Sequence, residues 1–207
     1  MSIRATGPEE KRRLLLAAAV RVFARKGFHT CRVGDVAEEA GVAHGLIYHY
    51  FDSKDAVLET IFRETWAELL RALREIETTV TPAREQLRHV AATVLRTWRH
   101  DPDLVRVLIR EVARGPQLQR EVEEISEAFA AIERIVAQGQ ERGELRSDLD
   151  ARLASVVFYG ALEEILTGWV LGQLDDGEDD VRRAEQTVVE LLFAGLAATG
   201  KPAPALR

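Results

Sequence analysis

The residues best suited to chemistry lie in the stretch GVAHGLIYHYFDSKDAVL, residues 41–58, which holds two histidines, two tyrosines and a lysine. Their ring N–H, hydroxyl and ammonium groups all donate hydrogen bonds, and phosphate oxygens accept them. On a helix, Ile47, Tyr50 and Phe51 share one face because they are spaced by three and four, and we expect that face to be buried. The opposite face then presents polar donors, which is typical of a nucleic-acid contact.

No comparable pattern indicates an enzyme. The sequence has no glycine-rich phosphate loop or nucleophile elbow, and its five histidines do not stand at metal-ligand spacing with carboxylates. Glu163 and Glu164 are adjacent, so on a helix their side chains point about 100° apart, which is poor geometry for a shared acid and base. We therefore expect no enzymatic activity, no cofactor and no metal.

The composition indicates a soluble chain. With 207 residues, 46% of them hydrophobic, the protein can bury a sizeable core, and its single cysteine, Cys31, fits a reducing cytoplasm. The segment KRRLLLAAAV, residues 11–20, has the basic flank and apolar run of a secretory signal. That run lasts only seven residues, so we interpret it as part of a helix and expect a cytoplasmic protein that does not enter a membrane.

Charge is distributed unevenly along the chain. The formal net charge is -6, yet residues 1–32 carry eight lysines or arginines against two glutamates, a local balance of +6. A localised basic surface can bind phosphates whatever the global charge. A DNA-binding head on an acidic body is one interpretation, and a chance run of surface arginines on one helix is the other.

Hydrophobic periodicity predicts an all-α chain of about nine helices. Apolar residues recur at spacings of three and four, and alternating β-branched runs are few. Pro8 fits the first position of a helix that ends near Gly27. Short helices follow at about 33–40 and 44–50, and a longer one begins after position 52 or 53.

The two short helices have the spacing of a helix-turn-helix. Ala37 is small enough for close helix approach, Gly41 can adopt the positive φ that the turn needs, and Ile47 is an apolar anchor on the second helix. Taken singly, Tyr48 is a core-edge aromatic and His49 a surface histidine. Taken together at this spacing, they favour a DNA contact.

The segment VFARKGFHTCRVGDVAEEAGVAHGLIYHYFDSKDAVL resembles the DNA-binding segment of the tetracycline-repressor (TetR/AcrR) family, over about residues 10–60. The match includes the Phe-Ala-x-x-Gly-Phe close of the first helix, the Asp-Val-Ala-x-x-Ala-Gly-Val turn and the Tyr-His-Tyr-Phe-x-Ser-Lys finish. The resemblance implies an all-helical homodimer that binds operator DNA. We expect the helix-turn-helix head at residues 1–52 and a helical ligand-binding and dimerisation domain at residues 53–207.

Carried over to this sequence, the resemblance implies a set of DNA contacts. Tyr48, His49 and Lys54 would meet phosphates, and the first turn of the recognition helix would lie closest to base edges. That first turn comprises Ala43, His44, Gly45 and Leu46. Ala43 and Arg32 depart from the pattern, because many members have a hydroxyl residue there, although Arg32 could reach a phosphate or a guanine.

The remaining chain is less diagnostic. Residues 137–171 are similar to the branch of the family that controls fatty-acid degradation genes and releases DNA on binding acyl-CoA. An apolar helical body could hold an acyl chain and arginines could meet its phosphates, although any one arginine is more simply a solvated side chain. The candidate ligand residues are Trp98, Arg99, Arg106, Arg110, Tyr159, Glu163 and Trp169.

The last two predicted helices, at about 150–173 and 179–199, carry candidates for subunit contacts. Glycines permit close approach of a partner helix, and two such helices from each subunit would form a four-helix bundle. Packing of the glycines inside one monomer is the alternative. The candidates are Gly160, Gly168, Gly172, Val188, Leu192, Gly195 and Leu196.

The sequence thus predicts a ligand-controlled TetR-type repressor that binds a palindromic operator as a dimer. A small apolar effector, with long-chain acyl-CoA as the leading candidate, would release it. Two alternatives stay open: a regulator that responds to a drug-like apolar ligand, and a helical dimer that acts through protein contacts with a degenerate DNA head.

Overall fold

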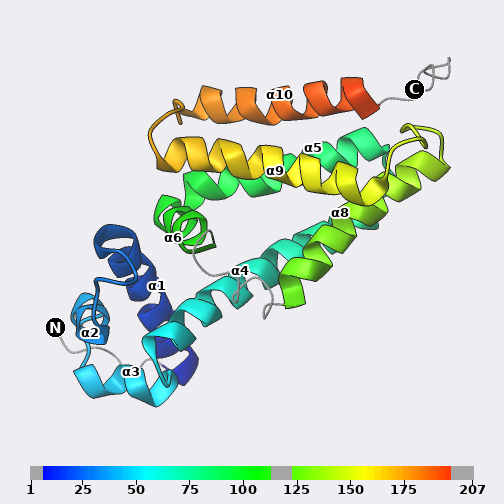
Figure 1. The fold of residues 1–207 in the computed structure, drawn as a ribbon. Coiled ribbons are helices and arrows are strands. Elements are labelled where there is room, and N and C mark those ends of the chain that lie inside the picture. Colours follow the sequence, from blue (N-terminus) through cyan, green and yellow to red (C-terminus); the bar gives the residue numbers. More distant parts are fainter. Residues whose placement is uncertain (1–6, 113–122, 197–207) are drawn as a thin grey trace. The chain divides into compact units, whose positions relative to one another are not determined.

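The structure is a computed structural model that describes residues 7–112 and 123–196, and over these residues it contains nine helices and no strand (Figure 1). The predicted all-α class is confirmed. The helices are α1 (Pro8–Lys26), α2 (Val33–Glu39), α3 (His44–Tyr50), α4 (Lys54–Glu77), α5 (Ala83–His100), α6 (Pro102–Val112), α8 (Glu123–Glu141), α9 (Ala151–Val170) and α10 (Glu178–Leu196).

The helices form two compact units, which are described separately. Unit 1 contains α1, α2, α3, the first half of α4 and α6. Unit 2 contains the second half of α4, α5, α8, α9 and α10. This division by contacts falls within α4 and differs from the boundary after residue 52 that the motif suggests, and that boundary stays a prediction.

Unit 1 is built on the buried stripe of α1. Pro8 stands at the start of this helix, where its missing N–H costs nothing, and the N–H of Gly27 closes the other end by donating to Phe23 O at 2.9 Å. Both helix ends agree with the prediction. This buried stripe comprises Leu15, Ala18, Ala19, Val22 and Phe23.

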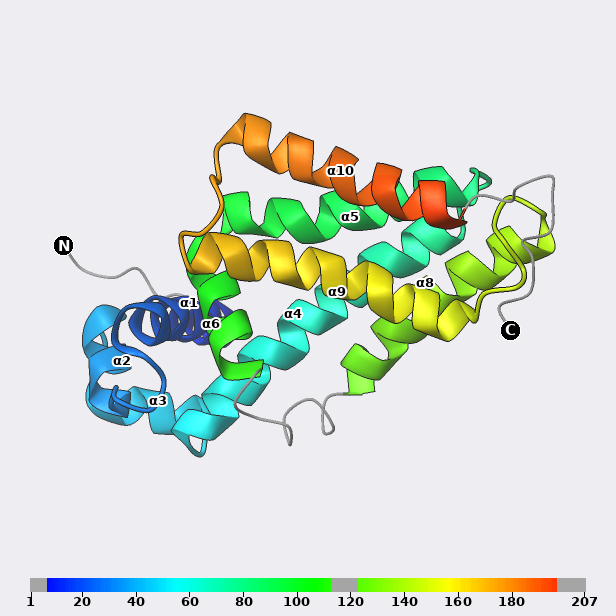
Figure 2. The ribbon, with the colours of Figure 1, turned by 45° about the horizontal axis from the view of Figure 1, so that its top comes forward.

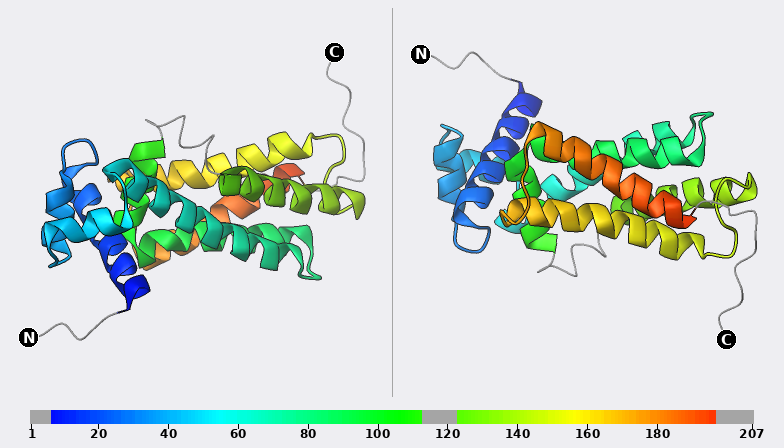
Figure 3. Two further views of the ribbon diagram at one scale, coloured as in Figure 1. Left: turned by 90° about the horizontal axis from the view of Figure 1, so that it is seen from below. Right: turned by 90° about the horizontal axis from the view of Figure 1, so that it is seen from above.

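In unit 2, α5 packs against α8, α9 and α10 (Figure 2), and α10 also lies beside α9 (Figure 3). The C-terminal carbonyls of α4 have no partner within their own helix. Buried Gln86 on α5 reaches this end of the helix, because its Nε2 donates at 3.2 Å to Ile76 O in the last turn and to Thr79 O just after it. One side chain of α5 therefore caps α4 inside the unit.

Among the described helices, α9 alone is long and apolar enough to cross a membrane, and length and composition are all that this criterion measures. Several of its apolar side chains are exposed, including Leu153 at 65% and Val157 at 59%. A helix that packs an apolar face on a partner has the same composition. The exposed face of α9 is therefore relevant to subunit contacts.

Candidate functional site

The turn between α2 and α3 has the geometry of a helix-turn-helix. Gly41 has a φ of +67°, a conformation that side-chain-bearing residues rarely adopt, and its N–H donates to Glu38 O at 3.0 Å. The N–H of Val42 donates to Ala37 O at 3.0 Å, and Ala37 is buried where the helices approach. The roles predicted for Ala37 and Gly41 are confirmed.

The inner face of α3 anchors it to unit 1. Ile47 is 1% exposed and Phe51, directly after the helix, is 6% exposed. Tyr50 is only partly buried, so it lies at the edge of this face rather than within it. Because one face is fixed in the core, the opposite face of α3 must point to solvent.

That solvent face carries several of the residues predicted to contact DNA, while Arg32 precedes α2 and Lys54 begins α4. Tyr48 is 51% exposed, so it is a surface residue. Ala43 precedes α3 without a side-chain hydrogen bond to the first turn, in line with the missing hydroxyl noted in the sequence. The exposed candidates are Arg32, Ala43, His44, Gly45, Tyr48 and His49, while Leu46 and Lys54 are partly exposed.

Lys54 has partners that the sequence did not predict. Its Nζ donates to Phe28 O at 2.5 Å and to Cys31 O at 3.0 Å, and it lies 4.5 Å from the centroid of the Phe28 ring. Two of its three N–H donors are thus engaged within the protein. Lys54 fastens the first turn of α4 to the loop after α1, which leaves at most one donor for a phosphate.

Ion pairs between α1 and α2 neutralise part of the basic N-terminal segment. Arg21 and Arg25 both donate to Glu39 at 2.8 Å, and Lys26 donates to Asp35 at 2.8 Å. Hydrogen bonds from Arg21 and then Arg25 lower the pKa of the Glu39 carboxyl. These three cations therefore join two helices. The basic side chains of this segment without an ion pair in the part of the chain that the structure describes are Lys11, Arg13 and Arg32.

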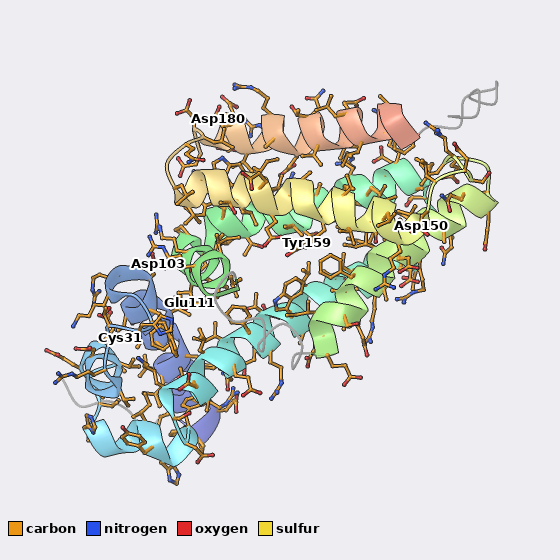
Figure 4. The ribbon with its side chains drawn as sticks, viewed as in Figure 1. Cys31, Asp103, Glu111, Asp150, Tyr159 and Asp180 are labelled. Atoms are coloured by element: carbon orange, nitrogen blue, oxygen red, sulfur yellow. The ribbon has the colours of Figure 1, made fainter. Side chains whose placement is uncertain are left out.

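Two ligand candidates, Arg106 and Arg110, lie on α6 in unit 1. Arg106 donates to Asp103 at 2.7 Å, and Arg110 donates to Ala24 O, near the end of α1, at 3.0 Å. The neighbouring buried Glu111, which is labelled in Figure 4, has a carboxylate oxygen 3.5 Å from Nε2 of His29. Three other ligand candidates form a cluster at the α9–α10 loop, in unit 2. The structure thus shows local contacts for these residues, and their part in ligand binding stays a prediction.

The α9–α10 loop is held by two indoles. Nε1 of Trp98 donates to Asp176 Oδ2 and Nε1 of Trp169 donates to Asp175 O, both at 3.0 Å. The two rings stack with centroids 6.2 Å apart, and both are buried. Arg99 donates to the Asp176 carbonyl at 3.3 Å. These contacts hold the α9–α10 loop in place. Trp98, Arg99 and Trp169 therefore have a structural role that does not depend on a ligand.

Tyr159 and Glu163 lie at an aromatic centre of unit 2. The Tyr159 ring lies 5.8 Å from Trp66 of α4 and 4.8 Å from Phe129 of α8, centroid to centroid. Figure 4 shows Tyr159 on the side of α9 that faces α8 and α4. Burial raises the pKa of Tyr159, and burial followed by repulsion from Glu164 raises the pKa of Glu163. The sequence did not predict that Trp66 and Phe129 meet Tyr159.

A groove of about 380 Å³ also lies between α4 and α8 in unit 2. Arg74 pairs with Glu127 across it. Its lining carries both signs of charge, so the groove alone does not select an anion. The lining residues are Ala67, Leu70, Arg71, Arg74, Glu123, Glu124 and Glu127.

The sequence matches two protein-family models, one over each part of the chain. The model for bacterial regulatory proteins of the tetR family matches residues 15–61, and the model for the C-terminal region of YsiA-like proteins matches residues 62–195. The chain belongs to the TetR family. The predicted TetR-type transcriptional repressor, with operator DNA as partner and a dimeric assembly, is confirmed at the level of this family.

Individual relatives are transcriptional regulators. The fatty acid metabolism regulator protein of Bacillus subtilis is 30% identical over 184 residues, covering 88% of this chain and 93% of that protein. The transcriptional repressor KstR2 of Rhodococcus jostii is 28% identical, covering 72% and 74%. Among solved structures, Bacillus subtilis FadR in complex with stearoyl-CoA has 30% identity and a TM-score of 0.79, covering 88% of this chain and 98% of that one.

The dimer candidates of this TetR-family chain divide into two groups. A Cβ on Gly168 would lie 2.7 Å from Leu174 of the same chain, Gly172 has a φ of +67° just past the end of α9, and Val188 is buried. Gly168 and Val188 thus have contacts inside the subunit and Gly172 ends a helix, and the part of all three in a dimer stays a prediction. Gly160 and Gly195 have open space around them, Leu192 is partly exposed, and the side chain of Leu196 lies outside the described residues.

The sequence did not predict the feature that most strongly indicates a subunit interface, which is a set of exposed apolar side chains. Large apolar side chains of α9, α10 and the turn between them are exposed, among them Leu191 at 70%. Amphipathic periodicity alone does not say which of two apolar faces is covered within the chain. These exposed side chains are Leu153, Val156, Val157, Leu171, Leu174 and Leu191.

Proposed function

We propose that this TetR-family protein is a dimeric repressor of fatty-acid degradation genes whose effector is a long-chain acyl-CoA. The observation that carries the proposal is the similarity over most of both chains to FadR solved with stearoyl-CoA. The protein acts in the cytoplasm through DNA binding alone, and no catalytic role is part of the proposal. Residues 1–52 serve as the operator-binding head and residues 53–207 as the effector and dimer domain.

The aromatic centre supports an apolar tail as ligand. Trp66, Phe129 and Tyr159 come from three helices and offer large apolar surfaces, with the Tyr159 hydroxyl and the Glu163 carboxyl as polar groups nearby. Each methylene removed from water contributes about 0.8 kcal/mol. Six additional methylenes would therefore contribute up to about 5 kcal/mol, so a tail that binds here must show a steep dependence on chain length.

Effector binding must also convert the helix-turn-helix head to a state that does not bind DNA. Moving a population from 1:99 to 99:1 takes about 5.5 kcal/mol of differential affinity for the DNA-incompetent state. Helix α4 supplies a covalent link, because its second half carries Trp66 and its first half begins at Lys54. A tail that displaces Trp66 would act on the helix that begins in the operator-binding unit.

The dimer face supports the repressor assembly. The exposed side chains of α9 and α10 would be buried by a second copy, and the open surroundings of Gly160 and Gly195 would let helices approach closely. A dimer places two copies of α3 on one duplex, which requires a palindromic operator with half-sites about one helical turn apart or a multiple of it.

The test is release of operator by acyl-CoA. A duplex is first selected from a randomised palindromic library, and its binding is followed by fluorescence anisotropy with octanoyl-, lauroyl- and stearoyl-CoA, free CoA and stearate. We expect release that strengthens with chain length and none with free CoA. Phe129→Ala should weaken the response, whereas Phe193→Ala, the same change on α10, should not.

Two results would contradict the proposal at different points. Indifference of the complex to every chain length, at concentrations well above micromolar, would remove acyl-CoA and favour a drug-like apolar effector. Failure to select any duplex would instead favour a dimer that acts through protein contacts.

A further inference from the structure

His44, on the first turn of α3, packs against α2 at a glycine. A Cβ built on Gly34 would lie 3.2 Å from Cδ2 and 3.3 Å from Nε2 of the His44 imidazole. Carbon atoms in favourable contact lie about 3.5–4.0 Å apart, so a side chain at position 34 would displace the ring by a few tenths of an ångström. The imidazole occupies this place because position 34 has no side chain.

The same ring contacts Tyr48. The two ring centroids are 5.7 Å apart at an interplanar angle of 50°, within the range of aromatic pairs. His44 is exposed, and its ring nitrogens make no hydrogen bond or ion pair to any residue that the structure describes. A ring supported by two neighbours, with both nitrogens unengaged, can present a donor or an acceptor to a base edge.

Gly34 is otherwise a poor choice for its place in the chain. It lies within α2, a helix of only seven residues, and glycine is the least favourable helix residue apart from proline. Neither a turn nor a positive φ explains it, since its backbone is helical. The close approach of His44 is the contact that a larger residue would disturb.

We infer that Gly34 is a specificity-determining position for operator recognition. Because residue 34 has no side chain, the His44 imidazole can lie against α2, and this position determines which base edges the ring contacts. Gly34 acts through His44 and is therefore a positioning residue. The inference rests on the proposed base reading by the first turn of α3. It adds that Gly34, a residue of α2 behind this turn, also affects which operator sequence the protein prefers.

The test measures base preference in a double-mutant cycle. Gly34→Ala, His44→Ala and the double variant are compared on the duplex selected by the wild-type protein and on its single base-pair variants, changed symmetrically in both half-sites. Glu38→Ala is the control, since Glu38 is an exposed residue of the same helix. Far-UV circular dichroism and thermal melts verify folding, and alanine at position 34 favours the helix.

We expect Gly34→Ala to change relative affinities roughly three- to tenfold, at the base pairs where His44→Ala also acts. In the His44→Ala background the same change should have no further effect on preference, because the ring that it displaces is gone. Glu38→Ala should shift affinity for all duplexes alike. Gly34→Ser should reproduce the altered preference of Gly34→Ala.

Equal effects of Gly34→Ala with and without His44, or a uniform loss over all duplexes, would overturn the inference. Either result would leave operator binding by α3 intact, since the wild-type protein would still discriminate among the duplexes. If His44→Ala changed no base preference, base reading by His44 would fail, and the inference would fail with it.

Discussion

Replacing Lys54 by methionine separates its internal contacts from a contact with DNA. Methionine keeps an unbranched apolar side chain but removes both hydrogen bonds, to Phe28 O and Cys31 O, and the cation above the Phe28 ring. Hydrogen bonds from charged groups contribute about 1.5–3 kcal/mol each, and we take the lower end because Lys54 is partly exposed. An exposed cation–π contact adds about 0.5–1 kcal/mol.

The free energy of unfolding should therefore fall by about 3–4 kcal/mol, which corresponds to a Tm lower by about 10 °C in a chain of this size. Lys11→Met is the matched control. It removes the same charge from a lysine without an ion pair in the described part of the chain, and it should change the free energy of unfolding by less than about 0.5 kcal/mol. Thermal melts and guanidinium titrations measure both variants.

The salt dependence of operator binding completes this experiment. A phosphate contact contributes about 0.9 to the slope of log K against log salt concentration, and an internal anchor contributes nothing. We expect the slope of Lys54→Met to equal that of the wild-type protein. An unchanged Tm together with a slope reduced by about 0.9 for each subunit would refute the anchor and restore the phosphate contact that the family resemblance implies.

Two further predictions concern unit 2. Burial, reinforced by Glu164, raises the pKa of Glu163, so the folded chain binds this proton more tightly than the unfolded chain. Stability is therefore reduced above the raised pKa and recovered as the pH falls toward the ordinary value of about 4.3. Glu163→Gln should raise the Tm at pH 8 and lose that advantage near pH 4, and an equal gain at both pH values would contradict this cause. Val157→Asp places a charge on the exposed face of α9 and should weaken the dimer at least roughly 100-fold in sedimentation, whereas Leu14→Asp in unit 1 should not. A Val157→Asp dimer that persists at nanomolar concentration would exclude this face.

The helix-turn-helix could be predicted from sequence because its constraints are local. Ala37, Gly41 and Ile47 lie within eleven positions, and each has a conformational or packing requirement that few residue types satisfy. The exposed face of α3 followed from the same helical periodicity, since the residues opposite Ile47 have nowhere else to point. Short-range patterns of this kind do not depend on how distant segments meet.

The partners of Lys54 and of the α1 cations could not be predicted in this way. Lys54 reaches carbonyls 26 and 23 positions earlier, and Arg21 reaches a glutamate 18 positions later. A backbone carbonyl has no sequence signature, and an acidic residue on α2 resembles any solvated glutamate until the helices pack. The local excess of positive charge therefore overstated the number of cations that remain for phosphates.

The glycines of α9 also show that spacing along the sequence does not predict tertiary contacts. Gly160, Gly168 and Gly172 stand at multiples of four, and this spacing suggested one face with one purpose. In the structure, Gly168 makes room for Leu174 and Gly172 ends the helix with a positive φ, while Gly160 is a helical glycine with open space around it. Spacing places residues on a common face, but the neighbour across that face decides whether a glycine serves the subunit or its partner. The exposure of Val157, one turn before Gly160, is therefore the better guide to where a second copy binds.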